Sequence, residues 1–224
     1  MYAGQIAPLG PRQSPSGIFK QKLAPPWVIT KSGLLGDHQG DLKIHGGLEK
    51  ALHQYPADHY QAWQRGFVEL RPYLGHAPAF GENLCLPEMT ESNVSVGDVF
   101  RLGTALLQVS QGRQPCWKLN VKFDRPDMAA MLQRTGRTGW YYRILEEGRA
   151  FPGDELKLVD RPHADWPLAR LNLMLASRSL APDDLRSMAE LRYLSAGWRK
   201  IASKRLASGR IEDWSLRLRG STDN

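Results

Sequence analysis

The chain has 224 residues, 42% of them hydrophobic, and its seven tryptophans indicate a folded globular protein rather than a disordered one. Two cysteines are too few for a disulfide framework, and no run of about 18 apolar residues predicts a transmembrane helix. The first residues lack a charged start followed by an apolar core, so we expect no secretory signal and a cytoplasmic location. The net charge is +7, with most of the surplus after residue 160, where it could attract nucleic acid or an anionic ligand, or only aid solubility.

Strand and loop signals dominate the first quarter of the chain. The β-branched run Trp27–Thr30 predicts a strand, and residues 33–41, with three glycines, predict a loop. Residues 42–47 predict a strand that ends in the glycine pair Gly46 and Gly47. Such a pair lets backbone N–H groups approach an anion, although an ordinary turn is the commoner reason for it. Residues 56–64 then predict a helix with proline in its first turn.

A hairpin is predicted over residues 94–109, with turns at Gly97-Asp98 and Gly103-Thr104. A helix should begin at Asp124 as the N-cap and end at Gly136. Residues 139–145 and 153–159 predict two further strands.

The pattern becomes helical after Pro167. Leu168, Leu171 and Leu175 are spaced for one face of a helix, and two further apolar stripes follow before residue 207. We therefore expect three short helices as a small appended module. Ile211 and Trp214 should fold the remaining tail back onto the protein.

Cys116 is the first candidate for chemistry. It follows the predicted hairpin, comes after Pro115, and has Arg113 and Lys118 nearby, and a neighbouring cation favours the thiolate. A free cysteine is equally often a small buried hydrophobe, which is how we interpret Cys85.

Three chemistries for Cys116 remain open from the residues alone. A nucleophile would need one of the histidines His38, His45, His53 or His59 as its base. A zinc site is weakly indicated, because no close ligand pair exists. A soft metal held by one thiolate is also possible if a cofactor supplies the other ligands.

Five short motifs occur in the order seen in MOSC-domain proteins. They are residues 33–37 (GLLGD), 43–47 (KIHGG), 51–56 (ALHQYP), 80–84 (FGENL) and 114–116 (QPC). The chain resembles this family over nearly its whole length, and in particular the bacterial YiiM type, whose C-terminal three-helix module is similar to residues 165–210. Each motif alone is weak, but five in order are specific.

The resemblance implies a mixed, β-rich fold: a MOSC-type β-barrel-like domain with peripheral helices and a small C-terminal three-helix module. The boundary implied is residues 1–162 for the MOSC domain, with a core at about 20–160, and 163–224 for the module and tail. It also implies the molybdenum cofactor, molybdopterin, with molybdenum bound by Cys116. Members of this type are similar to enzymes that reduce N-hydroxylated compounds, such as hydroxylaminopurine base analogues, to amines, a detoxification.

The resemblance further suggests roles for individual residues. Cations for the phosphate of the cofactor are Arg113, Lys43 and Lys118. Further cofactor contacts are expected from Gly46, Gly47, Asn83 and Gln111. Protons would be relayed by His45, His53 and Glu82. Glu82 and Asn83 could instead only stabilise a turn, and Asp37 could only close its own loop.

Partners and alternatives follow from the same observations. The sequence has no iron–sulfur cysteine cluster and no flavin motif, so electrons should come from a separate redox protein. No membrane contact is expected, and the oligomeric state, monomer or homodimer, is open. A carrier of the cofactor or of sulfur without turnover is the main alternative. A DNA reader built from the basic C-terminal helices is weaker, because their arginines are spread over all three helices.

Overall fold

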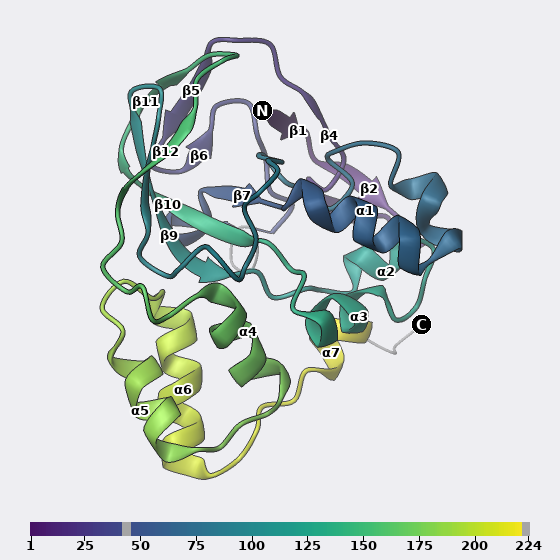
Figure 1. Ribbon diagram of the computed structural model, residues 1–224. Coiled ribbons are helices and arrows are strands. Elements are labelled where there is room, and N and C mark those ends of the chain that lie inside the picture. Colours follow the sequence, from purple (N-terminus) through teal and green to yellow (C-terminus); the bar gives the residue numbers. More distant parts are fainter. Residues whose placement is uncertain (42–45, 221–224) are drawn as a thin grey trace.

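The computed structural model describes residues 1–41 and 46–220, and its largest element is a five-stranded antiparallel sheet (Figure 1). Its strands, in order across the sheet, are β12 (Leu156–Asp160), β8 (Val99–Leu102), β9 (Ala105–Gly112), β10 (Trp140–Glu146) and β7 (Leu52–Gln54). β8 and β9 form the predicted hairpin, with Leu102 opposite Ala105. Gly103 makes this turn with a φ of 56°, in the region that favours glycine.

The register of the sheet brings the ends of three strands together. Tyr141 of β10 lies between Gln111 of β9 and His53 of β7, as the partner of both. The chain therefore leaves β9 at Gly112 close to His53 and Tyr141, although these residues are far apart in the sequence. This arrangement positions the segment that contains Cys116.

Smaller sheets surround the central one. β5 (Trp27–Thr30) lies between β11 (Gly148–Ala150) and β6 (Gly33–Leu34) in a three-stranded sheet. Two ribbons pair β1 (Tyr2–Gly4) with β4 (Lys20–Lys22), and β2 (Ala7–Leu9) with β3 (Ser14–Ser16). The described strands thus form four open sheets and no closed barrel, so the fold is mixed and the barrel-like shape is not confirmed.

A group of helices packs beside the sheet around an aromatic core of its own (Figure 1). Its elements are the 3₁₀ helix η2 (Val68–Tyr73) and the α-helices α1 (Ala57–Gly66), α2 (Lys118–Lys122) and α3 (Met128–Thr135). The other 3₁₀ helix, η1 (Leu48–Lys50), lies against β9 and β10 of the sheet instead. In this core the rings of Tyr55 and Phe80 stack with 3.9 Å between their centroids. Such a pair adds stability beyond the area it buries.

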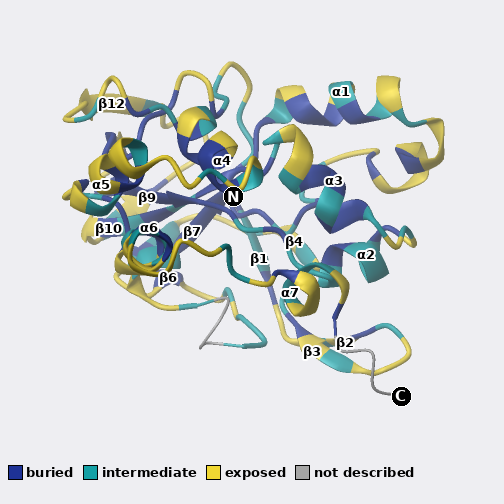
Figure 2. Ribbon diagram, turned by 90° about the horizontal axis from the view of Figure 1, so that it is seen from below, coloured by how far each residue is buried: buried dark blue, intermediate teal, exposed yellow. Residues whose placement is uncertain are grey.

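Three helices follow where the leucine spacing predicts them: α4 (Leu168–Ala176), α5 (Pro182–Glu190) and α6 (Ala196–Ser208). Residues of α4 are largely buried, whereas α5 and α6 expose much of their outer surface (Figure 2). Leu168 and Leu171 belong to the same hydrophobic cluster as Leu107 and Val109 of the sheet. Because this core is continuous, the domain boundary near residue 162 stays a prediction.

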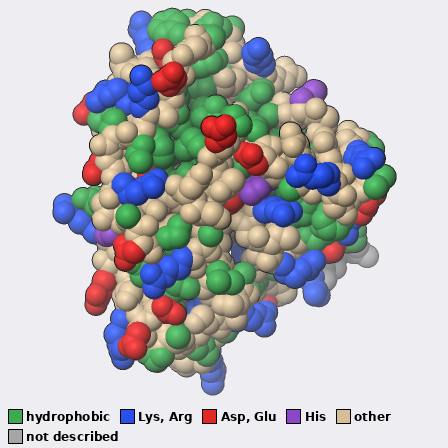
Figure 3. Space-filling model, in the orientation of Figure 1, with side chains coloured by type: hydrophobic (Ala, Val, Ile, Leu, Met, Phe, Trp, Pro, Cys, Tyr) green, Lys and Arg blue, Asp and Glu red, His purple; other side chains and the backbone are tan. Residues whose placement is uncertain are grey.

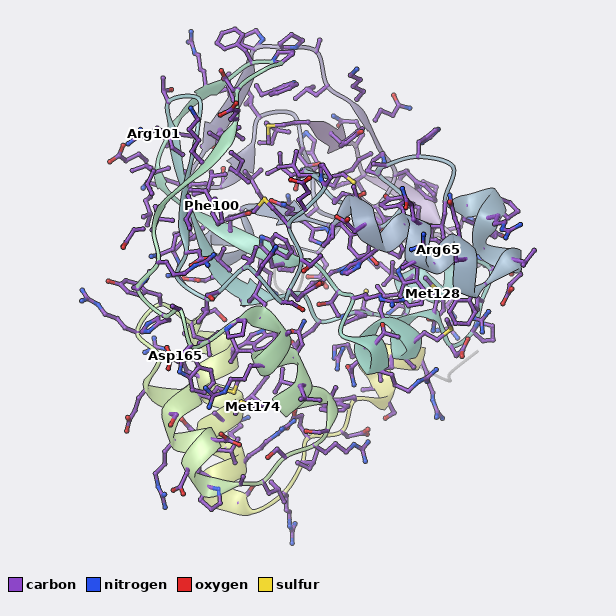
Figure 4. The ribbon with its side chains drawn as sticks, viewed as in Figure 1. Arg65, Phe100, Arg101, Met128, Asp165 and Met174 are labelled. Carbon is purple, nitrogen blue, oxygen red and sulfur yellow. The ribbon has the colours of Figure 1, made fainter. Side chains whose placement is uncertain are left out.

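Side chains from these parts fill separate interior regions (Figure 4). Phe100 of β8 and Met174 of α4 belong to the cluster shared by the sheet and the C-terminal helices, while Met128 of α3 belongs to the aromatic core. No helix in the described ranges has the length and apolar character needed to cross a membrane.

The helix predicted from Asp124 was misplaced. Asp124 has a φ of 46°, which is not a helix N-cap conformation, and α3 begins at Met128. The side chain of Asn120 caps it instead, since its Oδ1 accepts from the N–H of Ala129 at 2.8 Å. The short helix α2 before it was not predicted, and neither was α7 (Ser215–Arg219) in the tail. Gly136 ends α3 in the left-handed conformation, as expected.

Candidate functional site

A cavity that is open to solvent on one side lies where the segment after β9 meets β7 and the N-terminal ribbons. Five segments distant in sequence line it: residues 16–20, 37–40, 50–53, 80–83 and 113–118, together with Tyr141. Five of the predicted site residues line it, namely Cys116, Arg113, Lys118, His53 and Asn83.

Cys116 is half-buried in the turn that leads from β9 into α2. The N–H of Arg113 makes the last bond to the sheet, to the carbonyl of Gly139 at 2.9 Å. The carbonyl of Cys116 then accepts from the N–H of Leu119 at 3.0 Å, which starts the helical turn. The thiol is therefore presented to the cavity from a short loop fixed at both ends.

Arg113 is a buried cation beside this thiol. It is 8% exposed, and its Nη1 has no hydrogen-bond partner among the described residues. No carboxylate of the described chain lies within salt-bridge distance of it. A buried guanidinium with an unused donor leaves a large desolvation cost uncompensated, so the site is suited to an anionic ligand.

Three lysines complete the positive lining, two of which sequence reasoning missed. Lys118 donates to the carbonyl of Pro15 at 2.7 Å. Burial lowers the pKa of Lys50, with Asp41 opposing the shift. Burial also lowers the pKa of Lys20, although Asp37 binds it in an ion pair. Neither Lys20 nor Lys50 belongs to a motif, and only the tertiary fold brings them to Cys116.

His53 lines the cavity from β7 as a buried, neutral imidazole. Its side chain packs against Tyr141 with 5.1 Å between ring centroids. Its pKa lies well below the usual value, first because of burial and then because of the positive charge of Arg113. Its Nε2 has no hydrogen-bond partner among the described residues. His53 thus resists holding a second proton.

Asn83 lines the cavity, and its side-chain amide is hydrogen bonded within the protein. Its Oδ1 accepts from the N–H of His53 at 2.9 Å, and its Nδ2 donates to Asp37 at 2.8 Å and to the carbonyl of Tyr2 at 3.0 Å. These bonds fix the cavity wall. A contact from Asn83 to a cofactor stays a prediction.

Glu82 lies behind the wall rather than in it. Its side chain is fully buried, accepts from the hydroxyl of Tyr60, and accepts from the N–H of Phe80 at 3.0 Å. Burial raises the pKa of this carboxyl. Glu82 is absent from the cavity lining found for the described residues, so the geometry favours a structural role over proton relay.

The other predicted residues lie outside the lining or outside the described chain. Gln111 is buried, and its Nε2 donates to the carbonyl of Gly112 at 3.3 Å. Gly47 has a φ of 96° and its carbonyl accepts from the N–H of Lys50 at 2.8 Å, so here it forms a turn into η1. Gly46 directly precedes that turn. Lys43 and His45 lie outside the described residues.

A metal site made by the protein alone is not found in residues 1–41 and 46–220. No group of three or more His, Cys, Asp or Glu side chains there is placed to hold a metal ion. Basic side chains are also scattered among acidic ones on the face shown in Figure 3, rather than gathered into one stripe over the C-terminal helices. On that face, nothing favours the DNA-reading alternative.

Comparison with known proteins identifies two matching families. The MOSC domain profile matches residues 41–157, and the profile described as YiiM-like, 3-alpha helix domain matches residues 166–209. Protein YiiM of Escherichia coli K12 is 41% identical over 220 residues, which cover 98% of this chain and 97% of YiiM. The uncharacterized protein YflK of Bacillus subtilis is 42% identical, over 85% of this chain and 84% of YflK.

Solved structures agree with these sequence matches. The crystal structure of Escherichia coli YiiM has a TM-score of 0.81 at 36% identity, covering 97% of this chain and 98% of that one. YiiM from Geobacillus stearothermophilus has a TM-score of 0.77 at 34% identity, covering 92% and 96%. A Gibberella moniliformis protein named reductase is 37% identical over 86% of this chain, which corresponds to 34% of its own length.

Proposed function

The chain belongs to the MOSC-domain family and to its YiiM-like members, and from this premise we propose that it is a molybdenum-cofactor-dependent reductase. Its substrates would be N-hydroxylated compounds, such as hydroxylaminopurine-type base analogues, which it reduces to amines. One observation carries the proposal: the thiol of Cys116 and the buried, incompletely bonded guanidinium of Arg113 line the same cavity. The name of the Gibberella relative agrees with a reductase.

The residues of the cavity fit the cofactor. A cysteine thiolate is a soft ligand of the kind that suits a redox metal already held by sulfur. MOSC domains are associated with this cofactor, which carries a phosphate, and Arg113, Lys118 and Lys50 are the cations that would hold that group.

When bound, the cofactor would supply two electrons and accept the oxygen of the N-hydroxyl group. The protein would contribute the thiolate of Cys116, the cations that orient the cofactor, and a wall that limits access of water. Phe80 and Tyr141 lie in that wall and offer apolar surface to a planar substrate.

Protons must also enter, because converting an N-hydroxyl group to an amine and water consumes two of them. His53 is suited to orienting a substrate or a water molecule, since its lowered pKa keeps it neutral. Glu82 is too deeply placed to meet the substrate directly. The protons would then come from solvent through the open side of the cavity, and the electrons from a separate redox protein.

The decisive experiment compares protein purified from cells that can and cannot make the molybdenum cofactor. Molybdenum should be present in the wild-type protein from the first cells, lost in Cys116→Ala, and retained in the matched control Cys85→Ala. The loaded protein with a chemical reductant should convert 6-hydroxylaminopurine to adenine. Absence of molybdenum from the wild type, or full retention in Cys116→Ala, would refute the proposal. If the wild type retains molybdenum but does not reduce 6-hydroxylaminopurine, the protein is instead a carrier of the cofactor.

A further inference from the structure

The C-terminal tail, residues 209–220, returns from the helices to the Cys116 loop. It leaves α6 at Gly209, which has a φ of 60°, and ends in α7 beside α3 (Figure 1). The tail was expected to pack back through Ile211 and Trp214, but its contact with the loop was not foreseen. Of the two, Trp214 is 8% exposed, whereas Ile211 is half-buried.

Arg217 of α7 binds the residues on both sides of Cys116. Its Nη1 donates to the carbonyl of Pro115 at 2.6 Å, and its own carbonyl accepts from the N–H of Trp117 at 2.8 Å. The Nη2 donates to Oε1 of Gln133 in α3 at 2.6 Å. One residue of the tail therefore fixes the backbone before and after the cysteine and joins both to α3.

Neighbouring tail residues extend this contact. The side chain of Asn120 donates to the carbonyl of Leu218 at 2.8 Å. A Cβ added at Gly220 would lie 3.3 Å from the ring of Trp117, so the tail backbone passes directly over that side chain. Three tail residues, Arg217, Leu218 and Gly220, thus contact the loop and the start of α2.

The loop is bonded to the sheet at Arg113 and continues into α2, and between these points it depends on contacts with other segments. Pro115 has no N–H, so its carbonyl is the one backbone group through which it can be hydrogen bonded. The helix α2 that follows has five residues, too few to be stable without tertiary contacts. Bonds from Arg217 to Pro115 and Trp117 are accordingly a large part of what holds Cys116 in place.

The C-terminal helices anchor the tail at its other end. Glu212 accepts from Nε and Nη2 of Arg205 at 3.0 and 2.9 Å, and from Nε1 of Trp214 at 2.9 Å. Arg205, in α6, is 1% exposed and also donates to the carbonyl of Ser179 at 3.2 Å. Hydrogen bonds between partly buried side chains therefore connect α6 to the tail, and the tail in turn bonds to the loop that contains Cys116.

We propose that Arg217 is the positioning residue for Cys116, and that α4–α6 serve as the platform that holds it there. The claim about the loop is independent of the cofactor, while the consequence for metal retention rests on the function proposed above. Because a metal ligand must be held in its productive geometry, a loosened loop should retain the cofactor less well.

The first measurement is amide hydrogen exchange of the Cys116 loop in protein that lacks cofactor. Arg217→Gln removes the guanidinium. Arg217→Lys keeps a positively charged donor but cannot bond to Pro115 and Gln133 with two separate nitrogens. Arg219→Gln is the matched control, since Arg219 is on the same short helix and exposed. We expect the N–H of Trp117 to exchange about tenfold faster in Arg217→Gln, less so in Arg217→Lys, and as in wild type in Arg219→Gln.

The second measurement is molybdenum retained after dialysis of protein loaded in cells. It should fall severalfold in Arg217→Gln, with partial recovery in Arg217→Lys and with thermal midpoints of both variants close to that of Arg219→Gln. Exchange at Trp117 equal to wild type in Arg217→Gln would overturn the proposal, and so would a loss that Arg219→Gln shares. If wild type never carries molybdenum, the proposed function fails while the exchange result still decides the role of Arg217.

Discussion

Asn83 and Asp37 are joined through their side chains, with Nδ2 of Asn83 donating to Oδ2 of Asp37 at 2.8 Å. Asp37 also accepts from the N–H of Gly4 at 2.8 Å and from Lys20. The pair therefore ties the loop before residue 41, the N-terminal ribbon and β7 into one wall of the cavity. Asp37 also forms an ion pair with Lys20. Arg113, by contrast, is buried and has no carboxylate of the described residues within salt-bridge distance.

Asn83→Ala should destabilise the protein by about 3 kcal/mol, because the buried N–H of His53 and one oxygen of Asp37 lose their partners. Urea unfolding followed by circular dichroism measures this. Asn93→Ala is the matched control: that asparagine is exposed, so its loss should cost less than about 1 kcal/mol. A cost for Asn83→Ala no larger than that of the control would contradict the wall described here.

His53 should remain neutral well below the pH at which an exposed histidine titrates. Its folded pKa is lowered, so the unfolded chain binds the proton more readily. Stability from this group is therefore present above about pH 6.5 and is lost as pH falls below it. Proton NMR of the imidazole should show no titration of His53 between pH 6 and 7.5, with His53→Gln used for assignment. A midpoint near 6.5 would disprove the burial argument.

The two cysteines should differ sharply in reactivity. Burial, with Glu82 adding to it, raises the pKa of Cys85 to about 12, so almost none of it is thiolate at pH 8. Cys116 lines an open cavity. Iodoacetamide at pH 8 should therefore modify a single site, identified as Cys116 by peptide mass spectrometry. Cys116→Ala should abolish this reaction, Cys85→Ala should leave it unchanged, and rapid labelling of folded Cys85 would refute the assignment.

Local signals explain which parts of this fold could be predicted from the sequence. The β8–β9 hairpin depends on Gly103-Thr104 between alternating apolar residues, and α4 depends on the spacing of Leu168, Leu171 and Leu175. Both patterns lie within one element, where period and turn chemistry determine the structure. The order of the motifs similarly identified the family. Cys116, Arg113 and Lys118 line one cavity, and their contacts with a cofactor stay predictions.

Contacts between distant segments could not be predicted in this way. Lys20 and Lys50 carry no local sign of a site, and Arg217 is about a hundred residues from the loop that it holds. Glu82 lies within a family motif, yet its neighbours line the cavity while its own side chain turns toward Tyr60. Whether a given side chain points into the cavity or into the interior depends on the path of the backbone, which a motif does not specify.

Lys122 provides a test of buried charge in the alkaline range. Its Nζ donates to the carbonyls of Ile18 and Pro78 at 3.1 and 3.3 Å, and burial lowers its pKa to about 8 despite the opposing charge of Glu82. In the unfolded chain this lysine titrates near 10.4. Between these values the unfolded state binds more protons, so the contribution of Lys122 to stability rises with pH.

The wild-type protein should therefore gain about 1–2 kcal/mol relative to Lys122→Arg between pH 7 and pH 10, after allowance for partial solvent exposure. Arginine retains a charge but does not titrate in this range, so other alkaline groups cancel in the comparison. Urea unfolding at intervals of one pH unit measures the difference. Lys122→Met, which also does not titrate, should give the same slope from a different baseline. A difference that stays flat with pH in both variants would show that Lys122 keeps an ordinary pKa in the folded protein.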